Sequence, residues 1–450
     1  MNMAWLWSLL ACATSVTDVD FLPMQVLIIG AGGREHALAW KIAQSENVSQ
    51  VYVAPGNAGT AMENKVENVD IAAENISGLV TFARDKEIEL TIIGPEAPLV
   101  AGVVNVFNLA GLRCFGPRRE AAELEGSKAY MKDFLKRHRI PTAEFETFED
   151  IESASSYVRA RALPIVIKAD GLAAGKGVVI AQTYPEALDT VRSMLSGEAF
   201  GEAGKRIVVE EFLVGEEVSF IVMTDGETVI PFASSQDHKA RDDGDLGPNT
   251  GGMGAYTPAP IVDGELHARI IEEVIKPTLA GMAADRRPYT GFLYAGLMIG
   301  SDGAPKVLEY NCRFGDPETQ PIMMRLTSDL AQACLAVLEG NASSVQLEWD
   351  ARVALGVVIA SGGYPLNYTK GHTISGLDNS EINDAYVFHA GTALDDDAVV
   401  NAGGRVLCVV GLGDSVAQAQ QVAYARADEI SFEGAFCRRD IGYRAIAREV

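Results

Sequence analysis

The sequence is poor in cysteine, and its cysteines lie far apart. Six cysteines occur in 450 residues, and no two of them form a Cys-x-x-Cys pair. A disulfide scaffold needs a high density of cysteines and a zinc knuckle needs closely spaced ones, so the number and spacing argue against both. It fits a reducing compartment, and we expect a cytoplasmic protein.

Long apolar runs are also missing. The run Met3–Ala13 has 11 residues, which is too short to cross a bilayer as a helix. No Lys or Arg precedes Arg34, so the basic start of a secretory signal is absent. A lipoprotein cleavage site at Cys12 is the alternative. We expect residues 1–23 to be a disordered extension outside the family pattern, with Met24 opening the folded protein and no membrane partner.

Positive charge is scarce. Lys and Arg number 37 against 61 Asp and Glu, for a net charge of −24. A protein that neutralises nucleic-acid phosphates needs a basic surface, so no nucleic-acid partner is expected. A small anionic ligand stays possible, because a local basic cluster can oppose the global sign. The length suggests about three domains, and 48% hydrophobic with 22% charged residues is typical of a globular protein.

From Met24 onward, short β-rich runs alternate with helical patterns. Strands are predicted at Gln25–Ile29, Val51–Ala54 and Leu90–Gly94, with helices near Glu35–Gln44 and Ile76–Asp85. This alternation predicts a parallel, doubly wound α/β sheet whose ligand site lies beyond the carboxyl ends of the strands. The loops Gly30–Arg34, Pro55–Thr60 and Gly94–Pro98 stand at those ends.

Two further units follow. The predicted elements are helices near Lys128–His138 and Pro185–Leu195, with strands at Ile165–Ala169, Arg206–Phe212, Val218–Thr224, Phe292–Ile299 and Lys306–Asn311. Ser234–Tyr256 shows no clear period and reads as a long functional loop. After about Arg352 come short β runs and a final helix near Ser415–Ile430.

The first glycine cluster, Gly30-x-Gly32-x-x-Glu35, does not fit a dinucleotide site. Glu35 replaces the third glycine, and no acid for the ribose stands about 20 positions on. Arg34 at a helix N-terminus suits a single phosphate instead. A tight strand–helix turn with a surface arginine is the alternative.

The second cluster, Lys168 to Gly177, is not a Walker loop. Its spacing is Gly171-x-x-x-Gly175-Lys176, one residue short, and Gly177 replaces the metal-binding hydroxyl residue. A flexible glycine loop that covers phosphates fits, as does a simple hairpin turn.

Glu309 and Asn311 are candidate metal ligands. Residues i and i+2 of a strand point to the same face, so the two oxygen ligands would stand side by side. Magnesium prefers such ligands. An ion pair of Glu309 with Arg313 is the alternative.

Together these residues resemble the glycinamide ribonucleotide synthetase (phosphoribosylamine–glycine ligase) family of the ATP-grasp superfamily. The matching stretches follow family order from Met24 nearly to the C-terminus. They are GAGGREH (30–36), APGNAGT (54–60), GPEAPLV (94–100), LEGSK (124–128), IKADGLAAGKGV (167–178), EEFL (210–213), SQDHK (235–239), GPNTGGMGAY (247–256), GFLYAGL (291–297), NCRFGDPETQP (311–321) and HAGT (389–392).

The resemblance implies three domains and one reaction. Residues 24–125 would bind substrate, 126–350 would form a two-lobed ATP-grasp domain with a glycine-rich lid at about 146–214, and 351–450 would form a small α+β domain. ATP would phosphorylate the carboxylate of glycine, and the amine of 5-phosphoribosylamine would attack the acyl phosphate in purine biosynthesis. We expect a monomer that uses magnesium or manganese.

The resemblance also implies site roles. Residues nearest the reaction would be Lys168, Arg313, Asp237 and Asn249. ATP would meet Lys128, Lys168, Gly171, Gly175, Lys176, Gly177, Glu210, Glu211 and Glu217. The substrates would meet Gly32, Gly33, Arg34, Glu35, Asn57, Glu96, Lys239, Thr250 and Asp316, and the metal would meet Glu309 and Asn311.

Two features of the sequence bear on the site roles that the resemblance implies. Many ATP-grasp relatives carry a second acidic metal ligand on the preceding strand, but Tyr294–Gly300 has no carboxylate. His36, His238 and His389 lie in matched stretches, yet none is expected to be a general base, and His36 is expected to pack or hydrogen-bond. The competing functions are another ATP-grasp ligase, a nicotinamide-dependent oxidoreductase and a non-catalytic nucleotide-binding regulator.

Overall fold

The N-terminal part of the chain forms the predicted parallel sheet. The computed structural model describes residues 23–172, 177–197, 201–378 and 384–449, so the predicted extension lies outside the described residues except for Pro23. All five strands are parallel, in the order β3-β2-β1-β4-β5. They are β1 (Met24–Gly30), β2 (Val48–Pro55), β3 (Val66–Asn68), β4 (Leu90–Ile93) and β5 (Cys114–Phe115).

Helices cover this sheet because its central strand is apolar on both faces. Val26 to Ile29 are fully buried, as expected of a parallel strand between two helical layers. The helices are α1 (Gly33–Ala43), α2 (Ala58–Met62), α3 (Ile76–Asp85), α4 (Glu96–Ala101), α5 (Val103–Leu109) and α6 (Arg119–Gly126). Helices α1 and α4 start at the carboxyl ends of β1 and β4, which places Arg34 and Glu96 at the predicted ligand edge.

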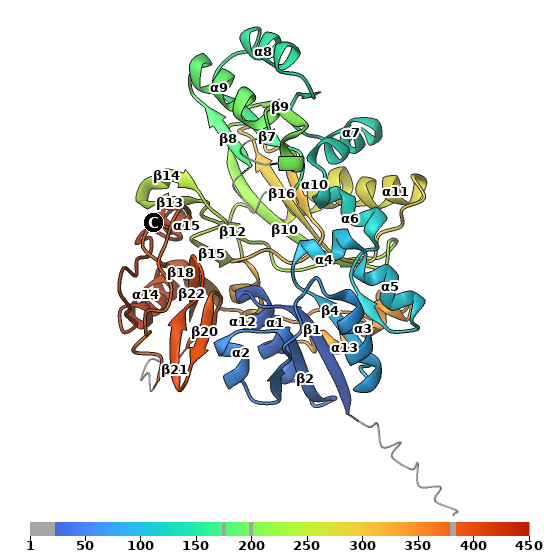
Figure 1. The fold of residues 1–450 in the computed structure, drawn as a ribbon, viewed down its shortest axis with the longest axis vertical. Helices are drawn as coiled ribbons and strands as arrows, with labels where there is room; N and C mark the ends of the chain where they lie inside the picture. Colours follow the sequence, from blue (N-terminus) through green and yellow to red (C-terminus); the bar gives the residue numbers. More distant parts are fainter. Residues whose placement is uncertain (1–22, 173–176, 198–200, 379–383, 450) are drawn as a thin grey trace, which may run out of the picture.

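A small lobe stands apart at the top of Figure 1. Its antiparallel sheet has the order β6-β9-β7-β8. The elements are β6 (Phe145–Phe148), α8 (Ile151–Arg159), β7 (Ile165–Ala169), β8 (Val178–Ala181), α9 (Tyr184–Leu195) and β9 (Ile207–Glu211). The two helices pack on the sheet around a core of their own that includes Val158, Ile167 and Val209.

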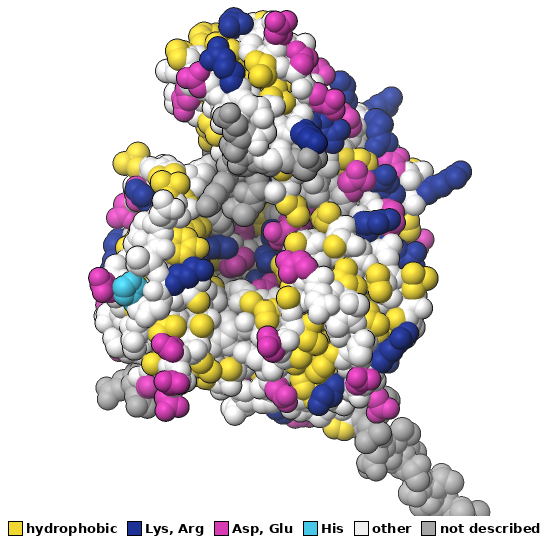
Figure 2. Space-filling model, viewed as in Figure 1, with side chains coloured by type: hydrophobic (Ala, Val, Ile, Leu, Met, Phe, Trp, Pro, Cys, Tyr) yellow, Lys and Arg dark blue, Asp and Glu magenta, His cyan; other side chains and the backbone are white. Residues whose placement is uncertain are grey.

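A second antiparallel sheet faces this lobe, in the order β11-β10-β16-β17. Its strands are β10 (Glu216–Thr224), β11 (Val229–Pro231), β16 (Gly291–Ile299) and β17 (Pro305–Asn311). Nearby helices are α7 (Lys128–His138), α10 (Gly264–Ile270), a π-helical turn (Ile271–Ile275) and α11 (Lys276–Ala284). Figure 2 shows a hollow between the small lobe and the body, where side chains of both charges gather.

The C-terminal sheet has the order β12-β15-β18-β22-β19. Its strands are β12 (Gln236–Asp237), β15 (Gly254–Thr257), β18 (Val353–Ala360), β19 (Ala385–His389) and β22 (Arg405–Gly413), followed by α14 (Val416–Ala427). The hairpin β20 (Thr392–Asp395) and β21 (Ala398–Asn401) lies beside it, and α12 (Thr319–Arg325) and α13 (Leu330–Leu338) precede β18 in the chain. Two of its strands therefore come from the 234–256 region, about 100 residues earlier in the chain.

Two sequence predictions need correction. Ser234–Tyr256 is not an unstructured loop, because it holds β12, β13 (Ala240–Asp242), β14 (Leu246–Asn249) and most of β15. These strands are two to four residues long and β15 pairs with the distant β18, so no local period marks them. The helix near 415–430 is not the last one, since α15 (Tyr443–Glu449) follows.

No helix within the described part of the chain combines the length and the apolar character needed to cross a membrane.

Aromatic rings join the N-terminal sheet to the β10–β16 sheet. The Phe292 ring centroid lies 4.6 Å from that of Phe115 and 4.3 Å from that of Phe314, and Phe232 packs against both Phe292 and Phe314. Phe292 is 2% exposed. This cluster fixes β16, and with it the floor of the hollow, to the parallel sheet.

We predict that Phe292→Ala lowers the free energy of unfolding by about 3–5 kcal/mol, because it opens a cavity in this cluster. Urea denaturation measures the change. Leu109→Ala, at a position 90% exposed on α5, is the control and should change it by less than about 0.5 kcal/mol. Equal effects of the two substitutions would contradict the prediction.

Candidate active site

A cavity of about 520 Å³ lies between the small lobe and the β10–β16–β17 sheet. The N-terminal and C-terminal parts of the chain also contribute to its wall. It is lined by sixteen of the predicted site residues: Arg34, Glu96, Lys128, Lys168, Gly177, Glu210, Glu211, Glu217, Asp237, Lys239, Asn249, Thr250, Glu309, Asn311, Arg313 and Asp316. Gly175 and Lys176 lie outside the described residues.

Lys168 enters the cavity from β7 and is held by a buried ion-pair relay. Glu210 on β9 pairs through one carboxylate oxygen with Lys168 and through the other with Lys132 of α7. Burial alone would raise the pKa of Glu210, but Lys168 and Lys132 together hold it below its usual value. The Lys168 ammonium also donates to the Leu308 carbonyl at 3.2 Å. The relay therefore fixes a positive charge at the cavity wall.

The sequence analysis missed Lys132. Its side chain is fully buried, and its ammonium donates to the Thr142 hydroxyl at 2.8 Å. Burial lowers the pKa of Lys132 to about 8. Lysines at every fourth position of a helix are typical of a solvated face, so the sequence carried no signal for this role.

The N-terminus of α7 places Lys128 opposite Lys168. Ser127 caps the helix, and the Asp170 carboxylate accepts from the Ser127 hydroxyl at 2.8 Å and from the Ala129 N–H at 2.7 Å. Arg206 pairs with the same carboxylate at 2.6 Å. The Lys128 ammonium donates to the Gly171 carbonyl at 3.0 Å, at the start of the glycine loop. This network ties Asp170 and Gly171 to the helix that bears Lys128.

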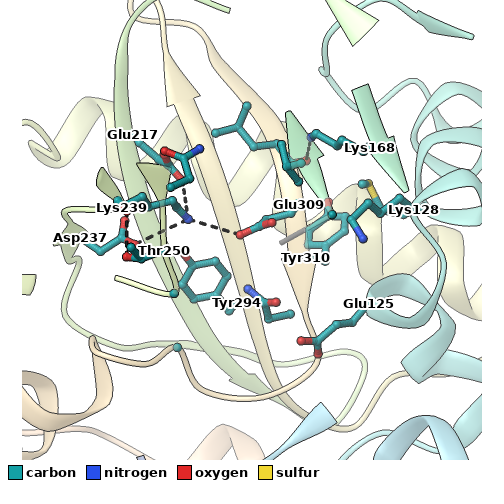
Figure 3. Close-up of a pocket in the computed structure, with 18 of the residues that line it drawn as sticks. Glu125, Lys128, Lys168, Glu217, Asp237, Lys239, Thr250, Tyr294, Glu309 and Tyr310 are labelled. Carbon is teal, nitrogen blue, oxygen red and sulfur yellow. Dashed lines mark hydrogen bonds and ion pairs between the residues drawn. The ribbon is translucent and has the colours of Figure 1, made fainter. Parts of the chain in front are cut away.

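Lys239 is the centre of an acidic cluster, shown in Figure 3. Its ammonium lies 2.8 Å from Glu217, 3.6 Å from Asp237 and 3.4 Å from Glu309. These side chains come from β10, β12 and β17, and Lys239 lies between β12 and β13. Lys239, against the opposing effect of burial, lowers the pKa of Glu309 to about 2, with Lys168 and Lys128 adding to the shift. Glu309 is therefore ionised at neutral pH.

Glu309 and Asn311 fit a divalent metal ion. They stand at alternate positions near the end of β17, opposite Gly296 and Tyr294 of β16, and both line the cavity. The acidic cluster carries more negative than positive charge. Arg313 does not pair with Glu309 as the alternative proposed, since it pairs with Glu96 at 3.2 Å and Glu125 at 2.8 Å.

Arg313 and Arg34 form a basic end of the cavity. Arg34 donates to Glu35 at 2.9 Å and to the Phe314 carbonyl at 3.2 Å. Burial raises the pKa of Glu125 to about 7, although Arg313 opposes the shift. Glu125 was not singled out from the sequence, although it stands in the matched LEGSK stretch.

The first glycine turn supports the site from behind. Glu35 turns back to the Gly32 N–H, and Asn57 caps α2 through the Thr60 N–H at 3.0 Å and donates to the His389 carbonyl at 3.0 Å. A Cβ at Gly33 would lie 2.5 Å from the Gln320 side chain. The turn is thus shaped by Gly32, Gly33, Glu35 and Asn57. None of these four residues lines the cavity, and Gly171 does not line it either.

The histidines have structural surroundings. The His389 N–H donates to Nδ1 of His36 at 2.7 Å, so the His36 proton sits on Nε2, 2.9 Å from Glu63. The expected hydrogen-bonding role of His36 is thereby confirmed. Burial lowers the pKa of His238 to about 4 and that of His389 to about 3, so both are neutral at pH 7.

Arg405 of β22 reaches into the cavity from the C-terminal sheet. Its guanidinium donates to the carbonyls of Gly251 at 2.8 Å and Asp316 at 2.7 Å and pairs with the Asp316 carboxylate at 3.1 Å. The Gly251 N–H donates to the Tyr364 hydroxyl at 3.1 Å. The C-terminal sheet thus holds the glycine-rich turn beside Thr250. The sequence analysis did not identify Arg405 as part of the site.

Comparison with protein families gives three matches along the chain. The descriptions are phosphoribosylglycinamide synthetase N domain for residues 24–125, ATP-grasp (A) domain for 126–319 and C domain for 354–444. The chain belongs to the phosphoribosylglycinamide synthetase family. Its relatives include the phosphoribosylamine–glycine ligase of Vibrio cholerae, 64% identical over 426 residues covering 95% of this chain and 99% of the relative. The Escherichia coli ligase is 61% identical, covering 95% of this chain and all of the relative.

Solved structures agree with this membership. The crystal structure of the Thermotoga maritima phosphoribosylamine–glycine ligase is 36% identical and has a TM-score of 0.80, covering 93% of this chain and 100% of that one. The ADP complex of N5-carboxyaminoimidazole ribonucleotide synthetase, 16% identical with a TM-score of 0.64, covers 90% of this chain and 96% of that one, and shows the shared fold. The predicted fold class, family and ligase activity are confirmed.

We predict that Arg405→Lys lowers the kcat/KM of this enzyme by about 10- to 100-fold. Lysine keeps the charge but cannot span two carbonyls and a carboxylate with one planar fork. ADP release in the complete reaction measures the loss. Arg352→Lys, in the same domain and paired with Asp350 and Asp384, is the control, and a loss of the same size there would count against the assigned contact role.

Proposed function

We propose that the cavity joins glycine to 5-phosphoribosylamine at the expense of ATP, through a glycyl phosphate. The observation that carries this proposal is the meeting of Lys128, Lys168, Lys239, Glu309 and Asn311 in one cavity between two sheets. Positive side chains for a polyphosphate and oxygen ligands for a metal stand there together. The family membership supplies the identity of the two substrates.

The chemistry requires positioning rather than a nucleophilic side chain. A carboxylate is a poor acyl donor until it is phosphorylated, and phosphoryl transfer depends on alignment and neutralised charge. Lys128 and Lys168 neutralise the phosphates of ATP, and Glu210 with Lys132 keeps Lys168 extended. Glu211 and Glu217 serve the nucleotide.

Glu309 and Asn311 hold a divalent ion. Magnesium and manganese both accept carboxylate and amide oxygens, and either ion would neutralise phosphate charge when bound. Lys239 keeps Glu309 ionised and ready to serve as a ligand.

Phosphoribosylamine binds at the basic end. Arg34 stands in the first turn of the 11-residue helix α1, where the helix dipole and a charge-assisted bond favour its phosphate. Glu96 pairs with Arg313 and orients its guanidinium at the same end of the cavity as Arg34. Asp237, Asn249, Thr250 and Asp316 border the space where glycine meets the amine.

The remaining assignments are part of the same proposal. Residues 24–125, 126–350 and 351–450 are the substrate-binding, ATP-grasp and C-terminal domains, with the lid at about 146–214. The protein acts in the cytoplasm as a monomer.

The deciding assay supplies ATP, magnesium, glycine and fresh phosphoribosylamine. Turnover must require both glycine and phosphoribosylamine. ADP release with a different acid or amine would favour another ligase.

We predict that Lys168→Met lowers kcat for ADP release by about 100-fold or more, because it deletes a phosphate-neutralising charge at similar length. Glu210 keeps its partner Lys132, so the melting temperature should fall by only a few degrees. Lys276→Met on the exposed face of α11 is the control, with no change in kcat. Parallel losses of stability and activity in Lys168→Met would favour a structural role.

We predict that Glu309→Gln raises the magnesium concentration for half-maximal activity by about 10-fold or more, because an amide is a weaker ligand than a carboxylate. A magnesium titration of the initial rate measures the shift. Glu272→Gln, an exposed acid beside α11, provides the comparison. An unchanged magnesium requirement in Glu309→Gln would refute the metal assignment.

A further inference from the structure

Two carboxylates at the basic end of the cavity share one guanidinium. Arg313 pairs through Nε with Glu96 at 3.2 Å and through a terminal nitrogen with Glu125 at 2.8 Å. The second oxygen of Glu125 accepts the Cys312 N–H at 2.6 Å. Both acids line the cavity, but the side chain of Glu125 is 6% exposed and that of Glu96 is 29% exposed. The two acids therefore differ in how much water reaches them.

Their surroundings push the two pKa values apart. Burial raises the pKa of Glu125 to about 7; Arg313 opposes this shift, and the charge of Glu96 adds to it. Burial would also raise the pKa of Glu96, but Arg313 and Arg34 together hold it below its usual value. Carboxyl groups with separated pKa values are typical of a site in which one acid stays ionised and the other exchanges a proton near neutral pH. Glu96 is the first of these and Glu125 the second.

Glu125 also stands between the two ends of the cavity. It lies near the end of α6, three residues before Lys128, and the Lys128 ammonium interacts electrostatically with both the Glu125 and the Glu309 carboxylates. On its other side is Arg313, at the basic end. Figure 3 shows Glu125 below Lys128 and Glu309. An acyl phosphate held near Lys128 and Glu309 and an amine held near Arg313 would therefore meet beside Glu125.

The other groups around Glu125 are poor proton acceptors. Burial raises the pKa of Cys312 and of Tyr289, so both stay protonated at pH 7. The guanidinium groups of Arg34 and Arg313 have no acceptor atom. Among the described residues that line the cavity there is no histidine. Of these groups, Glu125 is the one suited to take up a proton at neutral pH.

We propose that Glu125 is the general base of the ligation step. The amine nitrogen of phosphoribosylamine forms a bond to the acyl carbon of glycyl phosphate, and phosphate leaves with the electron pair of the broken C–O bond. One proton of that nitrogen passes to the Glu125 carboxylate, which releases it to solvent after the product leaves. This role rests on the proposed function and names the group that takes the proton in it.

A single-turnover experiment separates phosphoryl transfer from ligation. With enzyme in excess over ATP and all co-substrates present, rapid quenching measures ADP and the amide product in the same samples. Glu125→Gln keeps the size of the side chain and an acceptor for the Cys312 N–H, but it cannot take the proton. Amide formation should slow by about 100-fold or more, while ADP formation stays within about 3-fold. The acyl phosphate is then lost to hydrolysis, so the yield of amide per ADP falls well below that of the wild type.

The pH dependence of the amide-forming rate gives a second readout. A general base must be ionised, so at saturating substrates the wild-type rate should rise with pH through about 7 and then level off. In Glu125→Gln this acidic limb should vanish and leave a slow rate that does not change with pH. A limb that comes from ionisation of the substrate would persist in the variant.

Two variants supply the comparisons. Glu96→Gln removes the other partner of Arg313, so it should raise the KM for phosphoribosylamine but keep the acidic limb. Glu123→Gln is the control on the same helix, where Glu123 pairs with Arg287. It should leave both the amide-forming rate and its pH profile unchanged.

Several results would overturn the assignment. An acidic limb that persists in Glu125→Gln, or equal losses of ADP and amide formation, contradicts a general base. A raised KM for phosphoribosylamine with an unchanged kcat would reduce Glu125 to a support for Arg313. If Glu125→Gln does not fold, Glu125→Asp must keep the acidic limb at a lower kcat, and loss of that limb would reject the proposal. A wild type that forms no amide from glycine and phosphoribosylamine would instead sink the proposed function itself.

Discussion

The site depends on the gathering of like charges around Lys239. Carboxylates from three different strands converge on one ammonium, at 2.8 to 3.6 Å. Without that ammonium the carboxylates would repel one another across a partly buried cavity, where charge interactions are stronger than in water. The same ammonium keeps Glu309 ionised. Lys239 thus organises the acidic half of the cavity while leaving it short of positive charge.

The basic half is organised by the reverse arrangement. Glu210 separates two lysines, and one of these, Lys168, is the group that faces the cavity. A buried charge is tolerated only when it is paired, so Lys132 and Glu210 are the structural condition for a fixed Lys168. Because Lys168 and Glu210 belong to the small lobe and Lys132 belongs to α7, the relay also links the lobe to the body. One half of the cavity is therefore basic and the other is acidic, and the phosphate and carboxylate groups of the proposed substrates would meet between them.

Much of the fold could be read from local pattern. Helices α3 and α7 and strand β7 have the bounds expected from the sequence, because apolar spacing and end signals agree there. The pairing of Glu309 with Asn311 on one face of β17 follows from the two-residue period of a strand. The 234–256 region could not be read in this way, since its strands are only two to four residues long and β15 joins its sheet through β18, about 100 residues away. Asn57 shows a further limit, because a glycine-rich motif could not reveal that its amide caps a helix.

The sequence by itself therefore determined the family, the parallel N-terminal sheet and most of the charged residues that line the cavity. Only the tertiary structure decided that Lys239 pairs with Glu309 across 70 positions, that Lys132 supports Lys168 through Glu210, and that Arg405 holds Gly251. The physical reason is that local periodicity sets the face on which a side chain stands. Which faces meet, and which charges are thereby buried together, depends on the packing of segments that are distant in the chain.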